Sequence, residues 1–201
     1  GYILQNTRTD PDFTQNFTKI RKDHTTFLQD EAERTKHYHK GIFVDIFPGD
    51  RVPSGKIGRK MQYIACAENL LYSRGHTSGS GGTIGKVERA LLKAPKEKYA
   101  ARRERAEKKI RSWNGDKSLQ YVFPSTIGSS RKYYPANLFE NMKTIEFNGN
   151  QYMCVTDTDA TLRVEYGDYM QLPPEEERVW KHHPFLIDFE HNFEELSSDG
   201  S

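Results

Sequence analysis

The sequence predicts an α+β protein, with strand-forming segments toward both ends of the chain and helix-forming segments between them. Short runs rich in aromatic, Ile, Val and Thr residues occur before residue 50 and after residue 118. Between them, apolar residues recur at helical spacing. The 201 residues, 35% hydrophobic and 29% charged, describe a globular chain long enough for a sizeable core and exclude a disordered chain.

The N-terminal part predicts strands over residues 2–6 and 17–28, in which aromatic, Ile and Thr residues dominate. Asp10-Pro11-Asp12 supplies a turn between them. A compact apolar strand follows over residues 42–47 and is closed by Pro48-Gly49-Asp50.

Three helices are expected in the middle of the chain. The first begins near Lys56, and its apolar residues form one stripe: Ile57, Met61, Ile64, Ala65 and Leu71. A Gly/Ser/Thr-rich loop over 75–85 leads into the second helix. Pro95 ends that helix or opens the third, which runs to about Trp113.

The C-terminal part predicts four short strands and one short helix. Asn148-Gly149-Asn150 joins the last two strands as a hairpin. The helix is expected over 158–166, and the strands over 119–123, 131–134, 143–147 and 151–155. We expect one domain over 1–190 and a flexible acidic tail over 191–201.

The formal net charge of +2 hides a strong asymmetry. Residues 86–111 hold eleven Lys or Arg and four Glu, whereas residues 171–201 hold eight acids and two bases. A basic segment near an acidic tail indicates either internal pairing or a basic face for an anionic partner. Its helix over 96–111 either forms a solvated face or contacts an anionic partner such as a membrane surface. Nucleic acid is not an expected partner, because the overall charge is near neutral and the tail is acidic.

The two cysteines, Cys66 and Cys154, lie far apart in the sequence and outside any CxxC motif. They indicate reduced thiols in an intracellular compartment rather than a disulfide framework or a structural zinc site. No apolar run reaches the length of a membrane span, and no signal peptide opens the chain. The expected location is the cytoplasm.

Asp45 is the most informative residue, since it interrupts the apolar run Ile42-Phe43-Val44-Asp45-Ile46-Phe47. This run is typical of a strand buried on both faces. A carboxylate there is costly unless it binds a metal, pairs with a cation or accepts several hydrogen bonds. Asp45 is therefore either a metal ligand or general base, or a structural aspartate paired with a nearby Arg or with backbone amides.

Lys19 and Arg21 alternate on one face of the strand over 17–28. Two such cations can hold a diphosphate, Arg through a bidentate fork and Lys as a point charge. The alternative is a solvated sheet face. Two histidine pairs, His37 with His39 and His182 with His183, are weak candidates for metal binding. The loop over 75–85 does not match the P-loop pattern.

The segment from His39 to Pro48 resembles the signature of the LicD family of phosphocholine transferases, which includes the fukutin-related proteins. Further similar segments keep the order of the family and extend the resemblance over nearly the whole chain. They are Tyr2-Ile3-Leu4-Gln5 with Thr9-Asp10-Pro11, then Lys19-Ile20-Arg21 with Thr25-Thr26-Phe27, and last Tyr166-Gly167-Asp168-Tyr169-Met170 with Leu172-Pro173-Pro174-Glu175-Glu176 and Arg178.

The resemblance implies a nucleotidyltransferase-like mixed sheet flanked by helices. It also implies metal-assisted transfer of phosphocholine, or a similar phospho-alcohol, from CDP-choline or a related CDP-alcohol to a glycan of the teichoic acid or lipopolysaccharide type. Asp45 would be a catalytic residue and a ligand of Mg²⁺ or Mn²⁺. Lys19, Arg21 and His39 would bind substrate, and peripheral contact with the inner face of the membrane is a further expectation.

The Asp-rich segment that precedes the Tyr-Ile-Leu-Gln strand in the family is lacking in this sequence. We therefore expect an N-terminally incomplete domain, with little or no activity as it stands. The alternative hypothesis is a non-catalytic remnant that binds a glycan or an anionic polymer.

Overall fold

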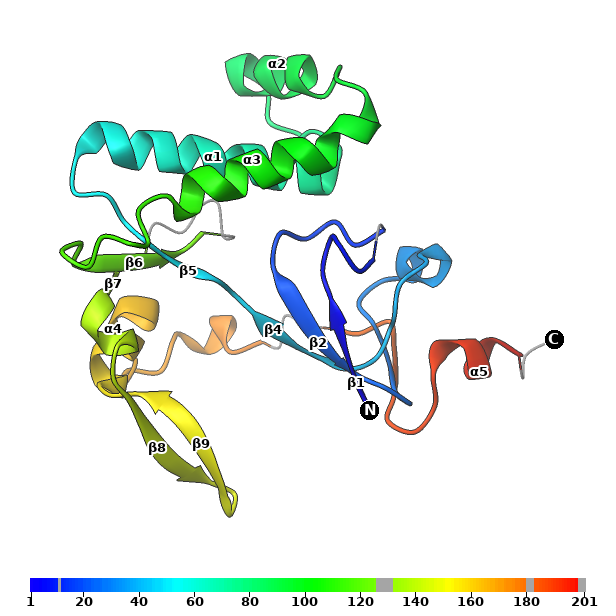
Figure 1. The fold of residues 1–201 in the computed structure, drawn as a ribbon. Coiled ribbons are helices and arrows are strands. Elements are labelled where there is room, and N and C mark those ends of the chain that lie inside the picture. Colours follow the sequence, from blue (N-terminus) through cyan, green and yellow to red (C-terminus); the bar gives the residue numbers. More distant parts are fainter. Residues whose placement is uncertain (11, 126–131, 180–182, 199–201) are drawn as a thin grey trace. The chain divides into compact units, whose positions relative to one another are not determined.

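The structure, a computed structural model, describes residues 1–10, 12–125, 132–179 and 183–198. Pro11, Arg131 and His182, which belong to expected motifs, lie outside these ranges. The predicted α+β class is confirmed (Figure 1). The described strands form four small sheets, and every strand pair is antiparallel, in contrast to the single mixed sheet expected.

The chain divides into two compact units. Unit 1 contains Gly1–Phe47, Asn69–Arg103 and the C-terminal segment from Arg178. Unit 2 contains Pro48–Glu68 and Glu104–Glu177. The single domain expected over 1–190 stays a prediction.

Unit 1 is built on a three-stranded sheet in the order β1-β2-β4. Its strands are β1 (Tyr2–Gln5), β2 (Thr18–Lys22) and β4 (Phe43–Ile46). β3 (Thr26–Leu28) is separate from β2, so the one strand expected over 17–28 is wrong. The chain turns between them, where His24 has a φ of 54° and ends the extended conformation.

The C-terminal segment of unit 1 pairs with β3. β10 (Leu186–Asp188) lies antiparallel to β3, and α5 (Phe193–Ser198) follows it. The hydroxyl of Thr26 donates to the carbonyl of His191 at 2.9 Å, and the amide of His24 donates to Oδ1 of Asn192 at 2.9 Å. Residues 191–198 of the expected flexible tail are therefore hydrogen-bonded or helical.

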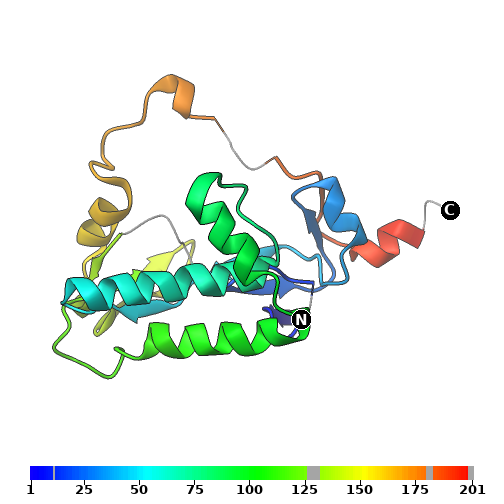
Figure 2. The same cartoon turned by 90° about the horizontal axis from the view of Figure 1, so that it is seen from above.

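The three expected helices are α1 (Lys56–Arg74), α2 (Gly82–Leu91) and α3 (Tyr99–Arg111), and a 3-10 turn over Lys96–Lys98 precedes α3. Figures 1 and 2 show α1 and α3 side by side. A second 3-10 helix covers Glu31–Thr35. Within the described ranges, no helix is both long and apolar enough to cross a bilayer.

Unit 2 contains two small sheets. One consists of β5 (Gly49–Arg51), β6 (Tyr121–Pro124) and β7 (Tyr134–Pro135). The other is the hairpin of β8 (Met142–Phe147) and β9 (Asn150–Val155), followed by α4 (Thr158–Tyr166). The short 3-10 helices Ala136–Phe139 and Glu175–Glu177 complete the unit.

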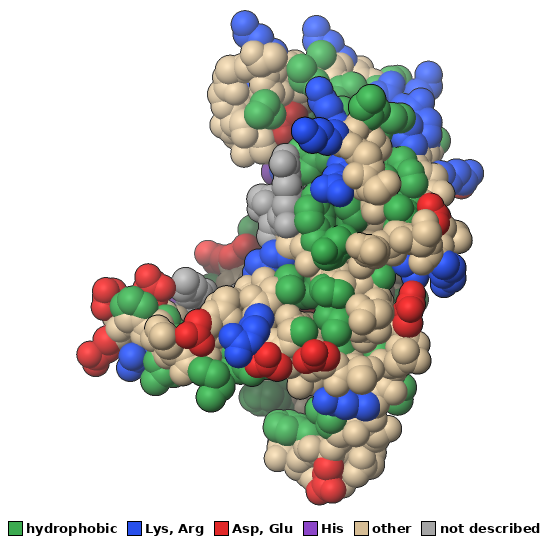
Figure 3. Space-filling model, turned by 90° about the vertical axis from the view of Figure 1, so that its left-hand side faces the viewer, with side chains coloured by type: hydrophobic (Ala, Val, Ile, Leu, Met, Phe, Trp, Pro, Cys, Tyr) green, Lys and Arg blue, Asp and Glu red, His purple; other side chains and the backbone are tan. Residues whose placement is uncertain are grey.

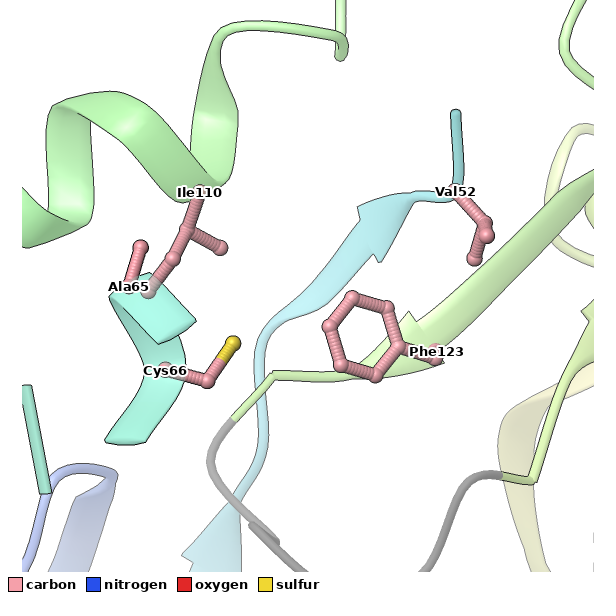
Figure 4. Packing of buried hydrophobic residues seen from close by; sticks show 5 residues of the cluster. All are labelled: Val52, Ala65, Cys66, Ile110 and Phe123. Carbon is pink, nitrogen blue, oxygen red and sulfur yellow. The ribbon is translucent and has the colours of Figure 1, made fainter. Parts of the chain in front are cut away.

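The core of unit 2 lies where α1, α3, β5 and β6 meet. Five buried residues form it: Val52, Ala65, Cys66, Ile110 and Phe123. Figure 4 shows Ile110 of α3 beside Ala65 of α1, with the Cys66 sulfur directed toward the strands. The side-chain amide of Gln62 donates to the carbonyls of Arg51 and Ile110 and so links β5 to both helices.

We expect Cys66 to resist thiol reagents in the folded protein. Burial, and to a smaller extent the negative charge of Asp50, raise the pKa of the Cys66 thiol to about 12. The thiol therefore stays protonated at pH 8, and the thiolate is the reactive form. Labelling with an aromatic disulfide at pH 8 should modify only half-buried Cys154 in native protein and both cysteines in urea. Rapid labelling of two thiols in native protein would contradict this burial.

Candidate functional site

The sheet of unit 1 brings three of the four predicted site residues to one face. Lys19 lies opposite Gln5 on one side and Asp45 on the other, and Arg21 lies opposite Ile3 and Phe43. Directly opposed residues share a face, and residues two apart on a strand share it too. Lys19, Arg21 and Asp45 therefore project from the same face.

Lys19 and Asp45 form an ion pair, with 3.3 Å between Nζ and Oδ1. The same Oδ1 atom is buried and has no hydrogen bond of good geometry, so the contact is Coulombic rather than a directed hydrogen bond. Burial lowers the pKa of the Lys19 ammonium, and the attraction of Asp45 opposes this shift.

The expectation that the Asp45 strand is buried on both faces is wrong. Val44, on the opposite face, is 68% exposed, and the Asp45 side chain itself is 31% exposed. The face of Val44 and Ile46 is exposed, and only the face of Phe43 and Asp45 is partly covered. The apolar run therefore belongs to a strand with one solvent-exposed face.

Arg21 is buried and holds the sheet to the segment that precedes β4. Its Nε donates to Oε1 of Gln5 at 2.6 Å, and its Nη1 donates to the carbonyl of Gly41 at 2.7 Å. The guanidinium lies 4.9 Å from the centre of the Phe43 ring, and burial lowers its pKa. With two nitrogens already bonded within the chain, Arg21 positions the face on which Lys19 lies.

Gln5 is a site residue that the sequence analysis missed. Its side chain is fully buried, accepts from Arg21, and donates to Oδ2 of Asp10 at 2.8 Å and to the carbonyl of His39 at 3.3 Å. A polar residue at the end of a short strand is unremarkable by itself. Only the register opposite Lys19 reveals that Gln5 belongs to this face.

His39 does not contact the group of Lys19 and Asp45 through its ring. Its Nδ1 accepts from the backbone amide of Gly41 at 3.1 Å, so the proton of the neutral ring is on Nε2, which faces Oδ1 of Asp23 at 3.4 Å. This contact lowers the pKa of Asp23. A side chain at Gly41 would collide with the carbonyl of Lys22 at 2.0 Å, so the turn needs glycine. His39 therefore stabilises the turn before β4.

Two pockets open beside Lys19. The first, which we call the aromatic pocket, has a volume of about 490 Å³ and is lined by Gln15, Phe17, Lys19, Phe27, Gln29, Ile42, Phe43 and Asp45. The second, the polar pocket, has a volume of about 240 Å³ and is lined by Phe13, Thr14, Gln15, Lys19, Arg21, Gln29, Asp30, Ala32, Glu33, Lys36 and Tyr38. They share Gln15, Lys19 and Gln29.

The carboxylates of the polar pocket already accept hydrogen bonds from other residues that line it. Glu33 accepts from the hydroxyl of Tyr38 at 2.9 Å and from the backbone amide of Gln29 at 2.7 Å. Asp30 accepts from the amide of Glu33 and caps the 3-10 helix. Burial, and then the bond to Glu33, raise the pKa of Tyr38, which stays a neutral donor. Lys19, Arg21 and Lys36 supply the positive charge of this pocket.

The described residues do not fit the metal that the family resemblance implies. They contain no group of three or more His, Cys, Asp or Glu side chains arranged to hold an ion. Mg²⁺ requires several oxygen ligands, and Asp45 is the one carboxylate lining the aromatic pocket. The Lys19 ammonium, 3.3 Å from Asp45, would also repel a divalent cation.

The basic segment is partly neutralised within α3. Lys108 pairs with Glu104 at 3.0 Å, and Arg111 pairs with Glu107 at 3.7 Å. Figure 3 shows Lys and Arg side chains in the upper part of the view, where apolar and acidic side chains lie between them. Such i, i+4 pairs are typical of a solvated helix face.

The C-terminal motif of the family resemblance lies in unit 2 up to Glu176, whereas its last residue, Arg178, belongs to unit 1. Tyr169 donates to Oδ1 of Asp159 at 2.8 Å, and Gly167, with a φ of 70°, ends α4. Comparison of the chain with protein families, with curated proteins and with solved structures gives no match. The geometry thus defines an α+β protein with a cationic and aromatic pocket pair in unit 1.

Proposed function

We propose that the chain carries the donor-binding face of a LicD-type transferase with a nucleotidyltransferase-like fold. In this proposal the enzyme moves phosphocholine, or a similar phospho-alcohol, from a CDP-linked donor to a cell-surface glycan of the teichoic acid or lipopolysaccharide type. The observation that carries it is the position of Lys19. This buried cation lies where the aromatic and polar pockets adjoin, 3.3 Å from Asp45.

Lys19 has the properties of a phosphate ligand. A lysine ammonium acts as a compact point charge, and a partly desolvated charge attracts an anion more strongly than a solvated one. Arg21 supports it from the same strand face through its bonds to Gln5 and Gly41. The roles of Asp45 in metal binding and in catalysis stay predictions, because one carboxylate beside an ammonium does not make a metal site.

A cytoplasmic location, with contact to a membrane surface through the basic segment, is part of the same proposal. Both cysteines are free thiols, which suits a reducing compartment. The exposed Lys and Arg side chains of α3 are the groups that would meet an anionic surface.

A second candidate function is metal-independent binding of an anionic glycan polymer at the same face. The single carboxylate of the aromatic pocket favours it, since binding of an anion needs the Lys19 charge but no metal. In this case the chain would be a binding module with the ancestry of a transferase.

We expect the chain to bind CDP-choline through Lys19. Lys19→Met should weaken binding by about tenfold or more, because a charged hydrogen bond contributes about 1.5–3 kcal/mol and tenfold corresponds to about 1.4 kcal/mol. Lys22→Met is the matched control, since Lys22 is exposed on the same strand and on the opposite face. Isothermal titration calorimetry gives both affinities. Equal affinities of the two variants for CDP-choline would contradict a role of Lys19 in binding.

Binding of CDP-choline separates the two candidate functions. The chain should bind CDP-choline if it carries the donor-binding face of a transferase, although it lacks the Asp-rich segment and is expected to release little or no CMP. Binding of teichoic acid without metal, together with the lack of CDP-choline binding, would favour the binding module instead.

A further inference from the structure

The part of α1 that belongs to unit 2 leaves apolar side chains exposed. Of the apolar stripe that the sequence predicts for this helix, Ala65 and Leu71 are buried. Ile57, Met61 and Ile64 lie three or four residues apart on one helix face and are 79%, 48% and 48% exposed. We call these three residues the α1 stripe. An amphipathic helix normally turns its apolar side toward a core, so a stripe that stays outside indicates a surface for another molecule.

Charged residues lie at both ends of the α1 stripe. Lys56 and Lys60 are exposed beside its N-terminal end, and half-buried Glu68 lies one turn after Ile64 at its C-terminal end. Among the residues that the structure describes, none forms an ion pair with Lys56, Lys60 or Glu68. The stripe therefore has a basic end and an acidic end, and each end lacks an opposite charge from its own chain.

A second copy of the chain complements this pattern. In an antiparallel helix pair related by a two-fold axis, the basic end of each copy meets the acidic end of the other, so the favourable contact occurs twice. The two stripes then lie against each other, with Met61 of one copy beside Ile64 of the other. A parallel pair would place the lysines of both copies together. An anionic surface would be repelled by Glu68, which argues against lipid as the partner.

We infer that the α1 stripe is a self-association surface, at which two copies of the chain pair antiparallel. Ile57, Met61 and Ile64 form its apolar centre, and Lys60 of each copy meets Glu68 of the other. One short helix face is smaller than the roughly 800 Å² that each partner contributes to a standard interface, so the dimer is weak. We expect a dissociation constant between about 10 μM and 1 mM, and a monomer at low micromolar concentrations.

The oligomeric state in solution tests this inference. Sedimentation velocity between about 10 μM and 1 mM should show a monomer–dimer equilibrium. Ile64→Glu places a charge without a partner at the centre of the contact and should raise the dissociation constant by at least about tenfold. Ile84→Glu is the matched control, because Ile84 is 65% exposed on α2 and lies outside the α1 stripe. It should leave the dissociation constant unchanged.

Reversing the charges tests the antiparallel arrangement. Glu68→Lys makes both ends of the stripe basic, and Lys56→Glu combined with Lys60→Glu makes both ends acidic. Each variant alone should dimerise at least about tenfold more weakly than the unsubstituted chain, because like charges then meet at both ends. An equimolar mixture of the two variants should recover the dimer, and 1 M salt should weaken it again. Recovery would also show that both variants are folded.

Three results would overturn the inference. The first is a chain that stays monomeric up to about 1 mM, a concentration at which even a weak specific contact is populated. The second is a dimer that survives Ile64→Glu, which would place the contact elsewhere on the molecule. The third is a monomer that sediments with phosphatidylglycerol vesicles and loses this binding in Ile64→Glu, which would assign the α1 stripe to lipid instead.

Discussion

Replacing Arg21 with methionine should lower the free energy of unfolding by about 3 kcal/mol, as followed by urea denaturation. The guanidinium is buried, and it donates to Gln5 at 2.6 Å and to the carbonyl of Gly41 at 2.7 Å. Methionine fills a similar volume but donates nothing, so two buried acceptors lose their partner. Each unsatisfied buried group costs about 1–3 kcal/mol.

Lys22→Met is the control for this substitution. It also replaces a cation with methionine on β2, but Lys22 is exposed and its expected effect is within about 0.5 kcal/mol. Arg21→Lys should recover only part of the loss, because a single ammonium does not reproduce the fork of the guanidinium. If Arg21→Met and Lys22→Met unfold at the same urea concentration, Arg21 is not the structural link assigned to it.

Ile110→Ala should destabilise the protein by about 3 kcal/mol, since removal of a buried isoleucine side chain costs about 2–5 kcal/mol. Ile110 is 3% exposed and packs in the core of unit 2 with Ala65 and Cys66 (Figure 4). The remaining cavity cannot be filled by those small neighbours. Thermal and urea unfolding measure the loss, and Cys66 should then label faster with thiol reagents.

The matched control is Ile57→Ala on α1. Ile57 is 79% exposed, so the same substitution removes little buried surface, and alanine has the higher helix propensity. We expect a change within about 0.5 kcal/mol. A loss at Ile57 as large as that at Ile110 would mean that burial does not determine the cost in these helices.

Local signals were sufficient for several elements. The helix expected over 158–166 is α4, with Asp157 accepting from the amide of Ala160 as an N-cap. The expected hairpin is β8–β9, in which Asn148 and Gly149 have φ values of 49° and 75°, as a tight two-residue turn requires. Neighbouring residues alone determine such features, so they can be predicted without knowledge of the fold.

The environment of Asp45, by contrast, could not be predicted from its neighbours in the sequence. The apolar run around it is compatible with a strand buried on both faces and with a strand that has one solvent-exposed face. Burial depends on what packs against each face of the sheet, and this is a property of residues far away in the sequence. The splitting of the strand over 17–28 has a similar cause, since β3 pairs with β10 near the other end of the chain.

The α+β class, the helices α1 to α4 and the β8–β9 hairpin could be predicted from the sequence alone, as could Lys19, Arg21 and Asp45 as candidates for a charged site. The tertiary structure decided that these three share one face, that Gln5 joins them, and that the His39 ring turns toward Asp23. Periodicity and capping are local and can be read from short segments. Register, burial and ion pairing join distant segments, and they follow only from how the strands pair.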